Sequence, residues 1–207
     1  MIAAIIDIVA SKDLDRKRRT AMDKSLRDIL AEVNAGFRDY CIARPALTQG
    51  DSIELLVNSW QPVVFLFHKL LMEEIRFRVG LGTGEITLKK DNADECDGPA
   101  FWNARQALDE VKQMKYMSRT AGFSIDDKAP KNEEMKVLNS IQFLATLLSQ
   151  TTTQLKHCYY YLWENKTLSE IASIVETSKA NVSKTLMKTP CYLLERIMAY
   201  LDGFHQR

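Results

Sequence analysis

The hydrophobic pattern of the chain changes near residue 130, and this change limits the possible folds more than any other feature. Before that point, short apolar runs typical of strands alternate with amphipathic segments of helical period. After it, every apolar segment has helical spacing. In a chain of 207 residues we therefore expect an α+β domain over residues 1–128, followed by an all-α domain over residues 129–207.

The first domain shows the order strand, helix, strand, strand, helix, strand, with a further helix and strand at its end. This order predicts a ferredoxin-like fold with an antiparallel sheet and its helices on one face. Pro45 lies inside one expected strand, so that strand belongs at an edge or contains a bulge. The expected strands are 1–10, 40–48, 52–57, 75–82 and 123–125, and the expected helices are 14–36, 61–74 and 99–116.

The second domain contains a segment whose spacing is typical of a helix-turn-helix. Two short helices, 168–175 and 178–187, carry apolar residues at contact positions, and Ser178 is a good N-cap for the second one. Glu176 stands in the turn where such motifs often have glycine, which is tolerable if its φ is positive. The segment is similar to the helix-turn-helix of bacterial transcription regulators and of region 4 of sigma factors. The other expected helices are 135–148, 153–164 and 190–201.

The second helix of this motif is expected to present a polar outer face to the DNA major groove. Lysines there would contact phosphates, while amide and hydroxyl side chains would reach base edges. The motif alone also fits an ordinary helical hairpin inside a bundle. The apolar faces of helices 135–148 and 190–201 would suit either a homodimer or the core of one chain. The candidate DNA-binding residues are Ser178, Lys179, Asn181, Ser183, Lys184, Thr185 and Lys188.

Composition excludes several other classes of protein. The net charge is +1, so contact with a nucleic acid has to come from a local basic patch. Four cysteines lack a CxxC pair, which argues against a zinc knuckle or a disulfide framework and favours reduced thiols. We expect a cytoplasmic protein without a membrane partner, because no apolar run is long enough to span a bilayer and the first ten residues do not resemble a signal peptide.

Two acidic residues in the first domain form a candidate metal site. Asp7 interrupts an apolar strand, and a buried carboxylate needs a metal, a cation or hydrogen-bond donors. Asp51 follows Gly50 at an expected hairpin, which neighbours the first strand in a ferredoxin-like sheet. Two carboxylates with open positions are what Mg²⁺ bound to phosphates requires. Pairing of either acid with Arg78 or Arg105 would instead favour a purely structural role.

These segments resemble the palm domain of class III nucleotidyl cyclases. Asp7 and Asp51 match the two metal-binding acids of that family, 78–86 looks like its arginine- and glycine-containing strand, and 98–105 is similar to a helix start there. The resemblance implies Mg²⁺ with a nucleotide as ligand. Asn103 and Arg105 are two residues apart instead of four, so we expect no cyclase activity. The candidate ligand- or phosphate-binding residues are Ser11, Lys12, Gly50, Asn103 and Arg105.

The combination of this domain with a C-terminal helix-turn-helix resembles the SatD family of small bacterial proteins. Its most specific stretch here is Asp-Gly-Pro-Ala-x-Trp-Asn-Ala-Arg at 97–105. The resemblance implies a regulator, and we expect DNA-binding transcriptional regulation with the first domain as a sensor or assembly module. The alternatives are a nucleotide-processing enzyme that uses Mg²⁺ held by Asp7 and Asp51, and a purely structural interaction protein.

Overall fold

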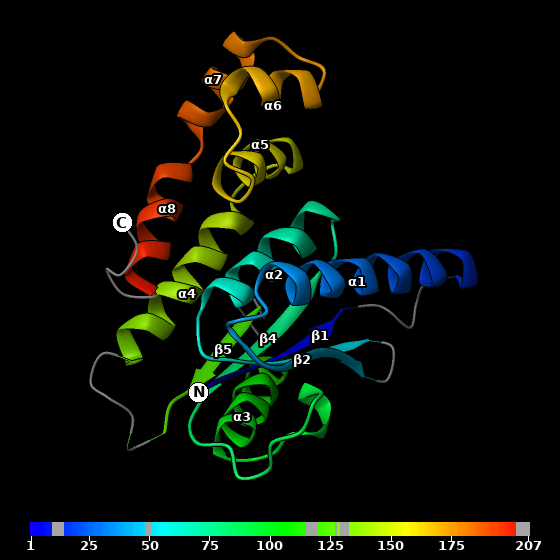
Figure 1. Ribbon diagram of the computed structural model, residues 1–207, viewed down its shortest axis with the longest axis vertical. Helices are drawn as coiled ribbons and strands as arrows, with labels where there is room; N and C mark the ends of the chain where they lie inside the picture. The colour runs from blue at the N-terminus through cyan, green and yellow to red at the C-terminus, as the bar shows by residue number, and fades with distance from the viewer. Residues whose placement is uncertain (10–14, 49–50, 115–119, 127, 129–132, 202–207) are drawn as a thin grey trace.

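The computed structural model describes residues 1–9, 15–48, 51–114, 120–126, 128 and 133–201 (Figure 1). It is an α+β fold, as expected, with a five-stranded sheet followed by a run of helices. The elements lie close to their predicted bounds. They are β1 Ile2–Ile8, α1 Arg16–Gly36, β2 Cys41–Thr48, β3 Ser52–Val57, α2 Gln61–Met72, β4 Phe77–Thr83, the 3₁₀ helix η2 Ala93–Glu95, α3 Pro99–Gln113, β5 Ala121–Ser124, α4 Glu133–Leu148, α5 Thr152–Leu162, α6 Leu168–Ile174, α7 Lys179–Lys188 and α8 Cys191–Leu201.

The sheet has the strand order β2-β3-β1-β4-β5, with β1 in the centre. β1 pairs with β3 and β4 in antiparallel fashion, but β5 runs parallel to β4. The prediction of an antiparallel sheet is therefore correct for β2, β3, β1 and β4 and wrong for β5, and the prediction that the helices lie on one face is wrong. α1 and α2 cover one face and α3 covers the other (Figure 1). A parallel connection from β4 to β5 requires a crossover helix, and α3 is that helix.

β1 is apolar along nearly its whole length because both of its faces are buried. Alternate residues of a strand point to opposite faces. Ala4 and Ile6 belong to the core under α1 and α2, whereas Ala3 and Ile5 belong to the smaller core under α3. By the same alternation Asp7 lies on the α3 face of the sheet.

Glycines of β4 allow α3 to pack directly against the strand backbone. A Cβ atom at Gly80 would collide with the carbonyl oxygen of Ala104 and lie 2.6 Å from the backbone nitrogen of Leu108. A Cβ atom at Gly82 would collide with backbone atoms of α3 in the same way. The spaced glycines of the 78–86 segment thus serve helix–sheet packing within this chain.

β2 is an edge strand, as Pro45 predicts. Its pairing with β3 shifts register between Ala43 and Ala46, the stretch that contains Pro45. Proline has no backbone N–H to donate to a neighbouring strand, so it is tolerated at such an irregularity.

The C-terminal helices share one continuous core with the α1–α2 face of the sheet. α2 packs against α1 on one side and against α4 and α5 on the other. The division at residues 128 and 129 therefore stays a prediction. Among the described residues no helix is both long enough and apolar enough to cross a membrane.

A disulfide joins Cys158 of α5 to Cys191 of α8, so the expectation of four reduced cysteines is wrong for this pair. The two Cα atoms lie 5.7 Å apart although 33 positions separate the residues in the sequence. Spacing along the chain could not reveal the pair, because it depends on how α5 and α8 pack. Cys41 and Cys96 are free.

Candidate functional site

The segment predicted to form a helix-turn-helix contains α6 and α7, which pack against each other and against α5. Ile171 of α6 and Val182 and Leu186 of α7 are buried at the centre of this unit. The turn contains Glu176 with a φ of 53°. This is the left-handed conformation expected at a position where such motifs often have glycine. The N–H of Thr177 donates to the carbonyl of Ala172 at 2.9 Å and closes the turn.

Side-chain caps fix the starts of both helices. The hydroxyl of Ser178 accepts from the N–H of Asn181 at 3.1 Å, as the N-cap prediction requires. Thr167 and Glu170 form a capping box at the start of α6. The Glu170 carboxylate accepts from the N–H and the hydroxyl of Thr167, and these bonds lower the pKa of Glu170. The direction of α7 relative to α6 is therefore set by local hydrogen bonds.

α7 presents its polar residues outward. Ser178, Asn181 and the three lysines are exposed, and Ser183 and Thr185 are half-buried. The side-chain nitrogen of Asn181 donates to the hydroxyl of Thr177 at 2.9 Å, which fixes the orientation of the amide. None of the lysines forms an ion pair with a residue in the described ranges. These lysines are Lys179, Lys184 and Lys188.

The fold places Asp7 on β1 and Asp51 in the turn directly before the adjacent strand β3. Asp7 stands opposite Ser52 in the β1–β3 pair, and the N–H of Ile8 donates to the carbonyl of Asp51 at 2.9 Å. The expected convergence of these two chain segments is therefore observed at the level of the backbone.

The Asp7 carboxylate is already paired with two cations. One of its oxygens lies 3.6 Å from a guanidinium nitrogen of Arg78 and 3.9 Å from the ammonium nitrogen of Lys112. Both Asp7 and Arg78 are 26% exposed, so solvent screens this cluster only in part. Sequence reasoning considered Arg78 as a partner but gave no signal for Lys112, which reaches the cluster from the far end of α3.

This donor set fits a divalent cation poorly. Within the described part of the chain no three His, Cys, Asp or Glu side chains gather as a metal site. Magnesium would have to displace a guanidinium and an ammonium from Asp7. The assignment of Asp7 and Asp51 to Mg²⁺ stays a prediction, and no chemical step is derived from it. The phosphate-binding candidates Ser11, Lys12 and Gly50 lie outside the described residues.

The phosphate-binding candidate Asn103 lies at the other end of the sheet. The side-chain nitrogen of Asn103 donates to the carbonyl of Thr83, which pairs with Ile2 at the start of β1. Asp7 lies five positions further along β1, or roughly 16 Å away at the usual rise of a strand. Within one chain, Asn103 and Asp7 therefore do not share a site.

Arg105 belongs to a separate cluster on the α3 face. It pairs with Asp97 at 3.6 Å, and the same carboxylate accepts from the indole N–H of Trp102 at 2.9 Å. Burial raises the pKa of Glu54, and the positive charge of Arg105 opposes that rise. The most specific stretch of the sequence, 97–105, therefore forms a hydrogen-bonded start to α3 with an exposed tryptophan.

Another feature that sequence reasoning missed joins α2 to α5. His68 of α2 is fully buried, with Nε2 at 2.8 Å from the carbonyl oxygen of Leu155. Its Nδ1 accepts from the indole N–H of Trp163 at 3.1 Å. Phe65 packs edge-on against the same indole. The sequence gives no sign that Leu155 and Trp163 are partners of His68, because both follow it by more than 80 residues.

Comparison with known proteins agrees with the resemblance seen in the sequence. The sequence model of the SatD family matches residues 1–199, so the chain belongs to the SatD family. No curated protein matches the chain. No solved structure matches it either.

Proposed function

We propose that this SatD family member is a DNA-binding transcriptional regulator in which α7 is the recognition helix. The observation that carries the proposal is the exposed surface of α7, where three lysines lack ionic partners among the described residues. Lys184 and Lys188 lie on the outward face of α7, and Lys179 lies at its N-terminal end. A protein that used this helix only for internal packing would not need these unpaired cations.

The dimensions of α7 suit the major groove. Its ten residues span about 15 Å, and the groove is about 12 Å wide and admits one α-helix. Lys184 and Lys188 stand one turn apart and would follow a phosphate backbone. Asn181 is held in a fixed rotamer by Thr177, and an oriented amide is suited to reading adenine.

A homodimer is part of the proposal because one copy offers few phosphate contacts. Three lysines that neutralise three phosphates would release about three counterions. The affinity of one copy for DNA would therefore be modest and strongly dependent on salt. Two copies would double this number and would read half-sites about 34 Å apart. The outer face of α8 is one candidate contact region, since it carries exposed apolar side chains. These are Tyr192, Leu193 and Tyr200.

The sheet would act as the sensing or assembly part of the same molecule. Its helix α2 is bonded to α5 through His68, and α5 supports both helices of the DNA-binding motif. A shift of α5 relative to α2 would therefore move α7 relative to the sheet. An effector changes DNA affinity only if it binds two such arrangements unequally.

The nucleotide-processing enzyme remains the second hypothesis, supported by the adjacent positions of Asp7 and Asp51. The ion pairs of Asp7 with Arg78 and Lys112 weigh against it. Turnover of ATP in the presence of Mg²⁺ separates the two hypotheses, because the enzyme requires turnover that Asp51→Asn abolishes, whereas a sensor would only bind the nucleotide.

The regulator proposal is tested by DNA-binding anisotropy with labelled genomic fragments at low and high salt. We expect binding that weakens with salt, and a loss of at least tenfold in the variant Lys179→Ala plus Lys184→Ala. The matched control is Lys24→Ala plus Lys89→Ala, which removes two exposed lysines from the sheet-bearing part of the chain. Equal losses in the two variants, or no binding at low salt, would contradict the proposal.

A further inference from the structure

We propose that a cavity at the junction of the sheet and α4 binds a small amphiphilic anion, a carboxylate with an apolar body of about ten carbons. The cavity has a volume of about 410 Å³ and lies where the end of β1, the starts of β4 and β5, and the ends of α2 and α4 meet. Binding at this cavity does not rest on the proposed DNA-binding function.

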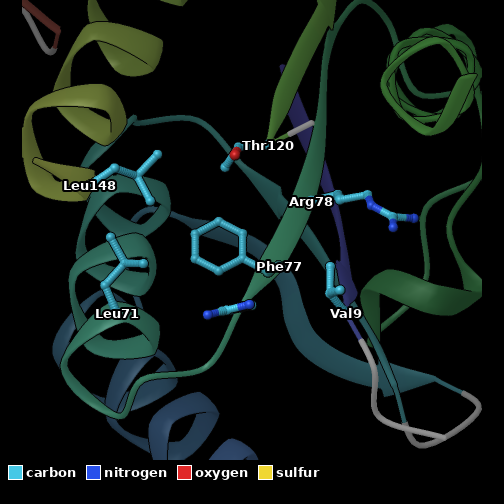
Figure 2. Close-up of a pocket in the computed structure, with 7 residues that line it drawn as sticks. Val9, Leu71, Phe77, Arg78, Thr120 and Leu148 are labelled. Carbon is cyan, nitrogen blue, oxygen red and sulfur yellow. The ribbon is translucent and has the colours of Figure 1, made fainter. Parts of the chain in front are cut away.

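The apolar wall of the cavity is formed on the helical side of β4. Figure 2 shows Leu71, Phe77 and Leu148 converging there from α2, β4 and α4. Phe77 is held in place by a stacked contact with Phe67, with ring centroids 5.6 Å apart. Leu148 is 44% exposed. An apolar body bound there would cover it.

The polar part of the cavity is cationic. Arg76 and Arg78 both line it, and Figure 2 shows Arg78 extending from the other side of β4 beside Val9. Arg76 is exposed and forms no ion pair with any residue that the structure describes. Arg78 shares the single carboxylate of Asp7 with Lys112. These ion pairs lie on the opposite side of β4 from Phe77, so the unpaired charge of Arg76 is what an anion bound in the cavity would balance.

The size of the cavity limits the ligand. A cavity of about 410 Å³ lies at the small end of the range of ligand pockets, about 300–1,000 Å³, and suits a ligand of about a dozen non-hydrogen atoms. A nucleoside triphosphate has more than twice that number of atoms, and it is too polar for a wall of leucine and phenylalanine. A medium-chain or aromatic monocarboxylate matches both the volume and the pairing of apolar wall with guanidinium.

Such a ligand would contact both halves of the molecule at once. Arg76 and Phe77 belong to the sheet region, whereas Leu148 is the last residue of α4, which packs against α2 and α8. If the chain regulates transcription as proposed above, this anion is a natural effector. Only that consequence depends on the proposed function.

The test is an amide NMR titration of the full chain with decanoate, which has twelve non-hydrogen atoms. We expect saturable shifts at the amides of residues 76–78 and 120. Decylammonium has the same tail with an opposite charge and should bind at least about tenfold more weakly. Absence of saturable decanoate shifts at these amides, or equal binding of the two probes, would overturn the proposal.

Two pairs of variants locate the site. Arg76→Gln should weaken decanoate binding by about fivefold or more, whereas Arg27→Gln, an exposed arginine on α1, should not change it. Leu148→Glu should abolish binding, whereas Leu138→Glu on the same helix should not. These two leucines are 44% and 43% exposed, so both variants are expected to fold. Equal effects within either pair would contradict the assignment.

Discussion

His68 should make the stability of the fold depend on pH between about 6.5 and 4. Its side chain is fully buried, and burial lowers the pKa of His68 from 6.5 to about 4. The hydrogen bond to Leu155 opposes this shift, and the nearby charge of Lys69 adds to it. Nδ1 of His68 can accept the hydrogen bond from the indole N–H of Trp163 only when the imidazole ring is neutral.

The sign and the size of the effect follow from proton binding. Below pH 6.5 the unfolded chain protonates His68 while the folded chain does not, so stability falls as the pH falls. The loss continues until the pH reaches the folded pKa of about 4. A difference of about 2.5 pKa units corresponds to about 3 kcal/mol in total.

The assay is urea unfolding followed by circular dichroism at several pH values between 7.5 and 4.5, for the wild type and for His68→Gln. Glutamine keeps a donor and an acceptor but does not titrate. Between these limits we expect the wild type to lose about 2–3 kcal/mol more than the variant. Other titrating groups, including His157, are present in both proteins and cancel in the comparison. Parallel pH profiles would refute the reasoning.

Two further predictions concern the backbone. Gly80→Ala should lower the free energy of unfolding by at least about 2 kcal/mol in urea titrations, because the new methyl group meets the backbone of α3. Gly36→Ala is the matched control, since a Cβ atom there would meet no atom within 4 Å, and an equal loss in both would disprove the packing role. Glu176→Gly should raise the midpoint of unfolding by the equivalent of about 0.5–1 kcal/mol, because glycine adopts a positive φ without strain. Glu176→Ala should give no such gain, and stabilisation by alanine would point to the charge of Glu176 instead.

Local signals in the sequence predicted the elements well. Ser178 as an N-cap and Glu176 at a left-handed turn depend on neighbours within a few residues, and the structure contains both. Pro45 at an irregular edge is another case of this kind. Such features follow from the geometry of one turn or one strand, so a single sequence contains the information needed to find them.

Non-local arrangement was harder to predict. The parallel pairing of β5 with β4, and the placement of α3 on the second face, depend on how distant segments pack. The glycine spacing at 78–86 resembles that of the nucleotidyl cyclases, although Gly80 and Gly82 meet α3 in this chain. The contacts of Lys112 and of His68 could not be predicted either. No spacing along the chain relates these residues to the groups that they contact.

The salt dependence of DNA binding tests the central claim most directly. If the lysines of α7 lie on phosphates, a plot of log K against log salt concentration should have a slope of about −2.7 per bound copy, from three contacts at about 0.9 each. Lys184→Ala should reduce the magnitude of the slope by about 0.9, and Lys24→Ala should leave it unchanged. An unchanged slope in Lys184→Ala would mean that α7 does not lie along the duplex.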